Sequence, residues 1–358
     1  MSEPRSTRPS RELRPARPVA RLSSPAEVVA SLPVTLGFRP TESLVVVCCH
    51  EPRGRMGLCL RFDLPAHHDA TGLVREVGTR VRHEGATRVV LAVYTGSPDD
   101  PTGSGAGRVL PHRGLVDAVR EELRGVVVTE AALIRDDRFW SYLCGSTACC
   151  PADGTPVERG QDSPAVQLLQ AESVLRGQAV LPDRAAVTAS IAAPALPEAA
   201  AALDRLATCE ALLCEAMLED LVDARRASLG AWDEVLVRFC SPPGRLGDLE
   251  AAALAVALSD VLVRDAVCTR WVRAPQALAE LLAELCRRTP APYDVPAATL
   301  LAWVTYAGGA GALVGVALER ALSTDPTYPL ARLLEDALTR QVPPETIRGI
   351  LRTVSTLL

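Results

Sequence analysis

The chain has 358 residues, of which 48% are hydrophobic and 23% are charged, so it is long enough for two ordinary domains and most of it should fold. Its formal net charge of −5 argues against a dedicated nucleic-acid-binding protein, because such proteins present a basic surface. All 38 basic residues are arginine, and the absence of lysine excludes P-loop nucleotide hydrolases, protein kinases and enzymes that form a lysine Schiff base.

An arginine occurs at every third position from Arg5 to Arg17, in a stretch rich in proline and serine. We expect residues 1–22 to form a disordered arm, because this composition has too few apolar side chains to build a core. In a polyproline helix, which has three residues per turn, these arginines would line one side and offer a weak contact for an acidic surface. A solvated tail is the interpretation that we favour.

Residues 23–180 have the pattern of an α/β (or α+β) domain. The unbroken apolar run at 44–49 predicts a fully buried strand, and a second strand at 56–64 places Arg61 and Asp63 on one face. The order ββαβαββ indicates a mixed sheet that ends in a hairpin. The expected elements are a short helix that Ser24 caps and that ends at Leu32, strands at 44–49, 56–64, 88–94, 126–134 and 138–144, helices around 73–81 and 115–123, and a further helix near 164–176.

The C-terminal half shows no strand-like alternation and predicts an all-α domain over residues 201–358. A Pro/Ala-rich linker is expected at 181–200, and after it Leu203, Leu206 and Leu213 recur at helical spacing. Residues 297–338 have the pattern helix, Gly-Gly turn, helix, Asp-Pro turn and helix. This hairpin resembles a tetratricopeptide unit, but a solenoid needs about three repeats, so we expect one such unit within a helical domain.

Three cysteines lie close together in the segment FWSYLCGSTACCP, residues 139–151. A structural zinc site needs four ligands, and four residues separate Cys144 from Cys149, which is wide for zinc ligands. The nearest further ligands, in CCH at 48–50, alternate between the two faces of a strand, so at most one of the two cysteines could reach. We therefore assign no metal, and Cys144, Cys149 and Cys150 remain only weak candidates for a structural metal or redox site.

Two kinds of thiol chemistry stay open for this segment. A redox pair would join Cys144 to Cys149 or Cys150, if the intervening turn brings their Cα atoms within about 7 Å. A nucleophilic thiolate would need an activating positive charge, for which Arg138 or Arg61 is available.

A packing role is the interpretation that we favour for these cysteines. The aromatic side chains of residues 139–142 would pack between the sheet and the helical domain, and the thiols would fill small gaps.

Two other clusters of residues are also explained by local structure without a functional site. His67 and His68 precede Asp69 where a strand ends and a helix begins, so Asp69 is a natural cap. The stretch GSGAGR at 103–108 lacks the glycine spacing of a dinucleotide-binding loop and indicates a surface loop.

Four stretches of the sequence resemble the bacterial domain-of-unknown-function family 4192. They are LPVTLGFRPTESLVVV (32–47), RMGLCLRFDLP (55–65), RFWSYLCGSTACCPADGTPV (138–157) and ALERALSTDPTYPLARLLEDAL (317–338). The resemblance implies no particular activity, because that of the family is unassigned. The matching pattern includes Gly37, Phe38, Pro40, Ser43, Arg61, Asp63, Arg138, Trp140, Ser141, Cys144, Cys149, Cys150 and Gly154, and leaves out Cys48, Cys49, His50, His67 and His68.

These observations favour a cytoplasmic interaction or regulatory protein whose helical domain binds a protein partner. The failure of each catalytic template argues against an enzyme, and we expect no cofactor, no nucleic acid and no membrane as partners. The alternative is an enzyme or a small-anion-binding protein, with its site where the LGFRPTES loop and the RFWSYLC segment converge. The residues of that site would be Ser43, Arg61, Asp63, Arg138, Trp140, Ser141 and Cys144.

Overall fold

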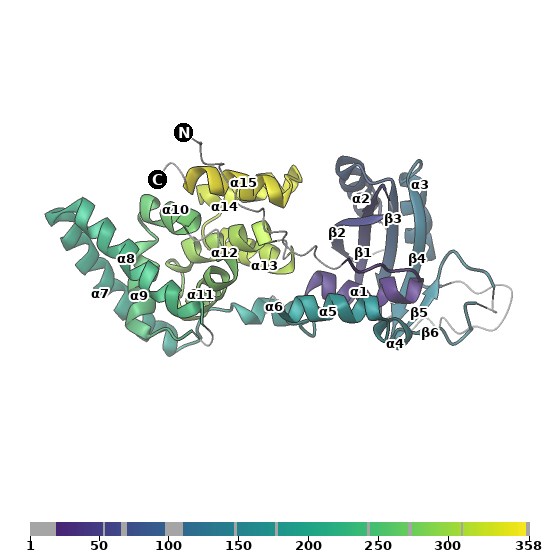
Figure 1. Cartoon of the computed structure of the whole chain (residues 1–358), viewed down its shortest axis with the longest axis horizontal. Coiled ribbons are helices and arrows are strands. Elements are labelled where there is room, and N and C mark those ends of the chain that lie inside the picture. The colour runs from purple at the N-terminus through teal and green to yellow at the C-terminus, as the bar shows by residue number, and fades with distance from the viewer. Residues whose placement is uncertain are drawn as a thin grey trace, which may run out of the picture.

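The structure is a computed structural model, and it describes residues 19–52, 54–65, 70–96, 110–146, 149–175, 178–241, 244–270, 274–308 and 311–355. Most of the expected arm at 1–22 lies outside the described residues, as do His67, His68, Asp69 and the loop at 103–108. A part built around a sheet and a part built of helices lie next to each other along the long axis of the molecule (Figure 1).

The sheet has six strands in the spatial order β2-β1-β3-β4-β5-β6. Among the strand pairs of the described residues, β3 and β4 are parallel and the other neighbours are antiparallel, so the predicted mixed sheet is confirmed. The predicted order ββαβαββ is not matched, because a sixth strand follows the hairpin. The strands are β1 (Ser43–His50), β2 (Arg55–Asp63), β3 (Arg88–Tyr94), β4 (Val127–Arg135), β5 (Arg138–Ser141) and β6 (Thr155–Pro156).

Helices cover both faces of this sheet, which makes three layers (Figure 1). Because side chains alternate along a strand, Leu44 and Val46 of β1 pack toward α2 (Thr71–Glu84) and α3 (Arg113–Glu122). Val45 and Val47 pack on the other face, toward α1 (Pro25–Leu36) and α5 (Pro164–Leu175). A short helix, α4 (Glu158–Gln161), packs against α1. The unbroken apolar run of β1 is therefore explained by burial on two faces.

The first helix begins and ends with clear local signals. Ser24 and Glu27 form the reciprocal hydrogen bonds of a capping box, and Pro25 occupies the first turn, where no amide hydrogen is needed. The helix ends at Leu36 and is capped by Gly37, whose φ of 80° lies in the left-handed region that glycine adopts without strain. The helix is thus one turn longer than the segment ending at Leu32 that the sequence predicts.

The loop after α1 ties the sheet part to the helical part. The Leu181 amide donates to the carbonyl of Gly37 at 2.9 Å, and the Arg39 amide donates to the carbonyl of Leu181 at 3.0 Å. Between these bonds, Phe38 is 4% exposed and belongs to the core of the helical part. The motif LGFRP, expected to line a site, therefore anchors one part of the chain to the other.

The helical part contains the remaining elements. The expected linker at 181–200 includes a helix, and Val187 and Ile191 are buried in the helical core. Residues 297–338 form helices where the sequence predicts them, and their resemblance to a tetratricopeptide unit stays a prediction. The helices are α6 (Arg184–Ser190), α7 (Glu198–Glu219), α8 (Leu221–Phe239), α9 (Asp248–Ala257), α10 (Val261–Arg270), α11 (Pro275–Arg288), α12 (Asp294–Gly308), α13 (Gly311–Thr324), α14 (Pro329–Thr339) and α15 (Pro344–Ser355).

Candidate functional site

The structure separates the predicted site residues into two groups. Ser43, Arg61 and Asp63 lie on β1 and β2, at one edge of the sheet. The other predicted residues lie on or just after β5, which is four strand positions away from β2. At about 4.8 Å per strand, this places β2 and β5 roughly 19 Å apart. The two groups therefore do not line one pocket. The second group consists of Arg138, Trp140, Ser141 and Cys144.

At the β2 edge, the side chains of Ser43, Arg61 and Asp63 contact one another and the neighbouring backbone. Arg61 donates from Nε to the Ser43 hydroxyl at 2.8 Å, and its Nη2 lies 2.6 Å from the Asp63 carboxylate. Ser43 in turn donates to the carbonyl of Thr41 at 2.6 Å. Because the guanidinium already has an acceptor and an opposite charge, this group fastens the sheet edge, and an added anion would have to compete with Asp63.

The aromatic side chains of β5, and of Tyr142 directly after it, belong to the cores of the sheet part. Trp140 and Tyr142 pack in the core that includes α2 and α3, whereas Phe139 packs in the core on the α1 side. The expectation that these rings pack between the sheet and the helical domain is therefore wrong. Side-chain alternation sends successive residues of β5 to opposite faces of the sheet, and both faces are covered by helices of the sheet part.

Residues 142–154, which we call the thiol loop, leave the end of β5 and return to β6. Ser141 holds the start of this loop, because its hydroxyl oxygen accepts from the amides of Leu143 at 3.1 Å and Cys144 at 3.2 Å. The same hydroxyl donates to the Glu130 carboxylate at 2.7 Å. A serine that bonds to following amides in this way fixes a turn, so the position of Cys144 is set by the strand before it.

Trp140 and Arg138 hold the other end of the thiol loop. The indole N–H of Trp140 donates to the carbonyl of Ala152 at 3.1 Å. Its ring lies so close to Gly154 that a Cβ there would come within 2.6 Å of the indole, and the φ of Gly154 is +79°. Arg138 donates from Nη1 to the carbonyls of Asp153 at 3.0 Å and Gly154 at 2.7 Å. Both ends of the loop are thus fastened to β5.

The thiol loop brings its three cysteines together. The Sγ atoms of Cys144 and Cys149 are 2.9 Å apart, and those of Cys144, Cys149 and Cys150 all lie within 4.8 Å of one another. The Cys150 amide donates to the carbonyl of Ser146 at 2.9 Å, which turns the chain back toward Cys144. Cys149 is exposed and the other two are half-buried. These thiols therefore sit at the surface, and the packing role favoured from the sequence does not describe them.

The environment makes two of these thiols chemically different. Hydrogen bonds from the Cys149 thiol and from the Ser146 backbone lower the pKa of Cys144. Burial, followed by the hydrogen bond and charge of Cys144, raises the pKa of Cys150 to about 12. Because the thiolate is the reactive form, Cys144 is the more reactive of the two near neutral pH.

This difference predicts the order of alkylation in metal-free protein. With iodoacetamide near pH 7, we expect Cys144 to react faster than Cys150, and the rate for Cys144 to level off at a lower pH than for an ordinary thiol with a pKa of about 8.5. Peptide mass mapping against time and pH measures both rates, with the exposed Cys214 as an internal reference. Modification of Cys150 before Cys144 would contradict the assigned environments.

In the helical part, α7 has two apolar faces. Ala202, Leu206 and Cys209 are buried, and the latter two pack in a small core with residues of α9. A second face is apolar but exposed, and its members fall within about 80° around the helix. The spacing of the leucines predicted that Leu203 and Leu206 share one face of the helix. The leucine pattern did not indicate a separate exposed apolar face, because alanines supply much of that face. This exposed face consists of Ala200, Leu203, Ala207, Ala211, Cys214 and Leu218.

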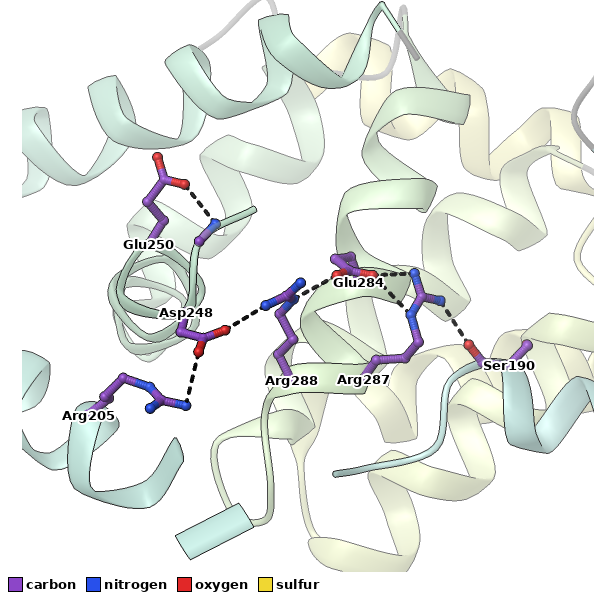
Figure 2. Close-up of polar contacts among 8 residues, drawn as sticks. Ser190, Arg205, Asp248, Glu250, Glu284, Arg287 and Arg288 are labelled. Atoms are coloured by element: carbon purple, nitrogen blue, oxygen red, sulfur yellow. Dashed lines mark hydrogen bonds and ion pairs between the residues drawn. The ribbon is translucent and has the colours of Figure 1, made fainter. Parts of the chain in front are cut away.

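A chain of arginine–carboxylate contacts positions α7 (Figure 2). Arg205 of α7 lies 3.6 Å from Asp248, the first residue of α9, which also accepts from Arg288 of α11 at 2.6 Å. Arg288 continues to Glu284 at 2.6 Å, and Arg287 donates to the same glutamate at 2.9 Å. Arg287 also donates to a carbonyl at the end of α6 at 2.8 Å. Four helices are therefore linked, and the exposed face of α7 stays directed away from them.

Glu284 is the hub of these contacts. Burial raises the pKa of its carboxyl group, but hydrogen bonds from Arg288 and Arg287 lower it by more, so the net direction is downward. A lowered pKa in the folded state means that ionised Glu284 stabilises the fold above the ordinary pKa near 4.5. This contribution is lost as the pH falls through the lower folded-state pKa.

Replacement of this hub predicts a stability difference that depends on pH. We expect Glu284→Gln to lower the free energy of unfolding by about 1 kcal/mol at neutral pH, and the difference from the wild type to shrink as the pH approaches about 2. Urea unfolding at several pH values measures it. Glu280→Gln, an exposed position one turn earlier on the same helix, is the control and should change little. An equal effect of Glu284→Gln at all pH values would contradict the assignment.

The fold and its contacts define a protein with a three-layer sheet part that carries a fastened thiol loop and a helical part with an unpartnered apolar face. The chain matches the family model described as a domain of unknown function (DUF4192) over residues 25–345, and it belongs to that family. Comparisons with curated proteins and with solved structures gave no match. Among the described helices, none is both long and apolar enough to cross a membrane.

Proposed function

We propose that this protein is a cytoplasmic interaction or regulatory protein that binds a partner through the exposed face of α7. The observation that supports this most is the second apolar face of a helix whose first apolar face already fills a core. Leu218 is 88% exposed and Leu203 is 40% exposed. Burying an exposed leucine side chain is worth about 1.5–3 kcal/mol, so covering this face would release substantial free energy.

Exposed apolar side chains also follow the end of α7 in the sequence. Asp220 caps α8 directly after α7, and Leu221 and Val222 at the start of α8 are 43% and 64% exposed. α7 contains 22 residues and is about 33 Å long, so it offers roughly three heptads of contact. In Figure 1, α7 and α8 lie at the end of the molecule farthest from the sheet part, where a partner helix has room to pack.

Charge indicates what kind of partner fits this face. Asp204, Glu215 and Glu219 border it on one side, all three are exposed, and none forms an ion pair with a described arginine. An amphipathic helix with arginine or lysine beside its apolar face would pair with these carboxylates. A second copy of this chain would instead bring a second set of carboxylates to the contact, so a different, basic protein is the favoured partner.

A designed peptide tests this surface directly. The probe is a labelled synthetic peptide of about three heptads, with leucine at positions a and d and arginine at e and g. We expect the full-length protein to bind it, and the double variant Ala207→Glu with Ala211→Glu to weaken binding at least tenfold, because two carboxylates would be buried in the contact. Fluorescence anisotropy measures the dissociation constants.

Two controls make the outcome specific. Ala201→Glu, at an exposed position of α7 outside the apolar face, should leave affinity within about twofold. A peptide with glutamate at e and g should bind much more weakly than the arginine peptide. Equal binding of the arginine peptide to the wild type and the double variant, with both proteins folded by circular dichroism, would refute the proposal.

A further inference from the structure

The thiol loop carries an arrangement that partner binding does not use. It places three thiols at the surface of the sheet part, whereas α7 lies at the other end of the molecule (Figure 1). Five side-chain or backbone contacts, made by Arg138, Trp140 and Ser141, hold the two ends of this loop. A loop fastened at both ends in this way keeps its sulfurs close to one another. We propose that Cys144, Cys149 and Cys150 bind one Zn²⁺ ion through their Sγ atoms, with the fourth coordination position open to solvent.

The spacing of the sulfurs suits this ion. Tetrahedral Zn²⁺ has Zn–S bonds of about 2.3 Å, which places the sulfurs about 3.8 Å from one another. The three Sγ atoms already lie within 4.8 Å of one another. Cys144 and Cys149, at 2.9 Å, need to separate by about 1 Å, which small side-chain rotations can provide because Cys149 is exposed.

The chemistry of the donors favours Zn²⁺ over hard cations. Thiolates select borderline and soft ions, whereas Mg²⁺ and Ca²⁺ require oxygen ligands. The nearby Glu130 carboxylate acts on Cys144 electrostatically and accepts a hydrogen bond from Ser141, so its negative charge also favours a cation at this place. Three protein ligands and one open position form a site where water or an external thiol can complete the tetrahedron.

Zinc binding accounts for this arrangement better than a nucleophilic cysteine does. A catalytic cysteine is usually activated by a neighbouring base or positive charge, but the nearest arginine of the segment, Arg138, is engaged with the Asp153 carboxylate and two backbone carbonyls. The groups that act on Cys144 are the other thiols, the Ser146 backbone and Glu130. The positive charge that would stabilise three thiolates is therefore supplied by the ion itself, and each thiol that binds releases its proton.

Cobalt substitution provides the test. Full-length protein, purified with a thiol reductant and a chelator and then exchanged into metal-free buffer, is titrated with Co²⁺. We expect one equivalent to give the visible and near-ultraviolet bands of tetrahedral thiolate coordination, and Zn²⁺ to displace it with loss of colour. The single variants Cys144→Ser, Cys149→Ser and Cys150→Ser should each weaken Co²⁺ binding about 100-fold or more, because each removes one of only three protein ligands.

Matched cysteines elsewhere in the chain serve as controls. Cys240 is also exposed, and the variant Cys240→Ser should leave Co²⁺ binding unchanged. A second measurement needs no variant: Zn²⁺ should protect the three cysteines of the thiol loop from N-ethylmaleimide, while Cys214 and Cys240 still react.

Three results would overturn the proposal. The first is Co²⁺ or Zn²⁺ binding that persists when all three cysteines of the thiol loop are replaced. The second is a wild-type protein with free thiols that binds no Zn²⁺ at micromolar concentration. The third is a Cys144–Cys149 disulfide, seen as the loss of two hydrogens in mass, that persists in the presence of Zn²⁺ and reductant and excludes the metal.

Discussion

The contact between the Trp140 ring and the backbone at Gly154 is the constraint on which the candidate metal site depends. The indole lies where a Cβ of any other residue would have to be, and its N–H holds the carbonyl of Ala152. This contact returns the thiol loop to the end of β5 from which it started. Without it, the chain between Cys144 and Cys149 would be free to spread, and keeping the sulfurs within 4.8 Å of one another would cost conformational entropy.

The two proposed activities occupy different parts of one chain. The strands β5 and β6 that flank the thiol loop lie at one end of the molecule, and α7 lies at the other (Figure 1). Phe38, buried in the helical core, and the backbone bonds to Leu181 join the two parts. Variants in the thiol loop and variants in α7 are therefore expected to act independently, because they share no contacts. Each proposal can fail without the other.

Local sequence patterns predicted most of the sheet part, because a strand buried on one face alternates apolar and polar residues and a strand buried on both faces is an unbroken apolar run. The run at 44–49 and the alternation that separates Arg61 from Leu60 both appear as expected. The site was harder to predict, because the order of strands in a sheet depends on pairing between segments that are distant in the sequence. β2 and β5 are each the second strand of a hairpin, and no local sequence pattern indicates that the sheet separates them by roughly 19 Å. The spacing of Cys144 and Cys149 counted against a metal, yet a turn at Ser146 makes sequence distance a poor measure of sulfur distance. The exposed face of α7 was missed because alanine occurs in cores and on surfaces alike.

The most direct test of this account is the Zn²⁺ affinity of the Gly154→Ala variant, measured by competition with a chromophoric chelator in full-length protein. The added methyl group would displace Trp140 and release the end of the thiol loop, so affinity should fall at least tenfold while the far-ultraviolet circular dichroism spectrum stays the same. Gly145→Ala is the matched control, because a Cβ at that position in the same loop meets no other atom within 4 Å. If both variants bind Zn²⁺ as tightly as the wild type, the packing of Trp140 on Gly154 does not shape the thiol site, and the central claim is wrong.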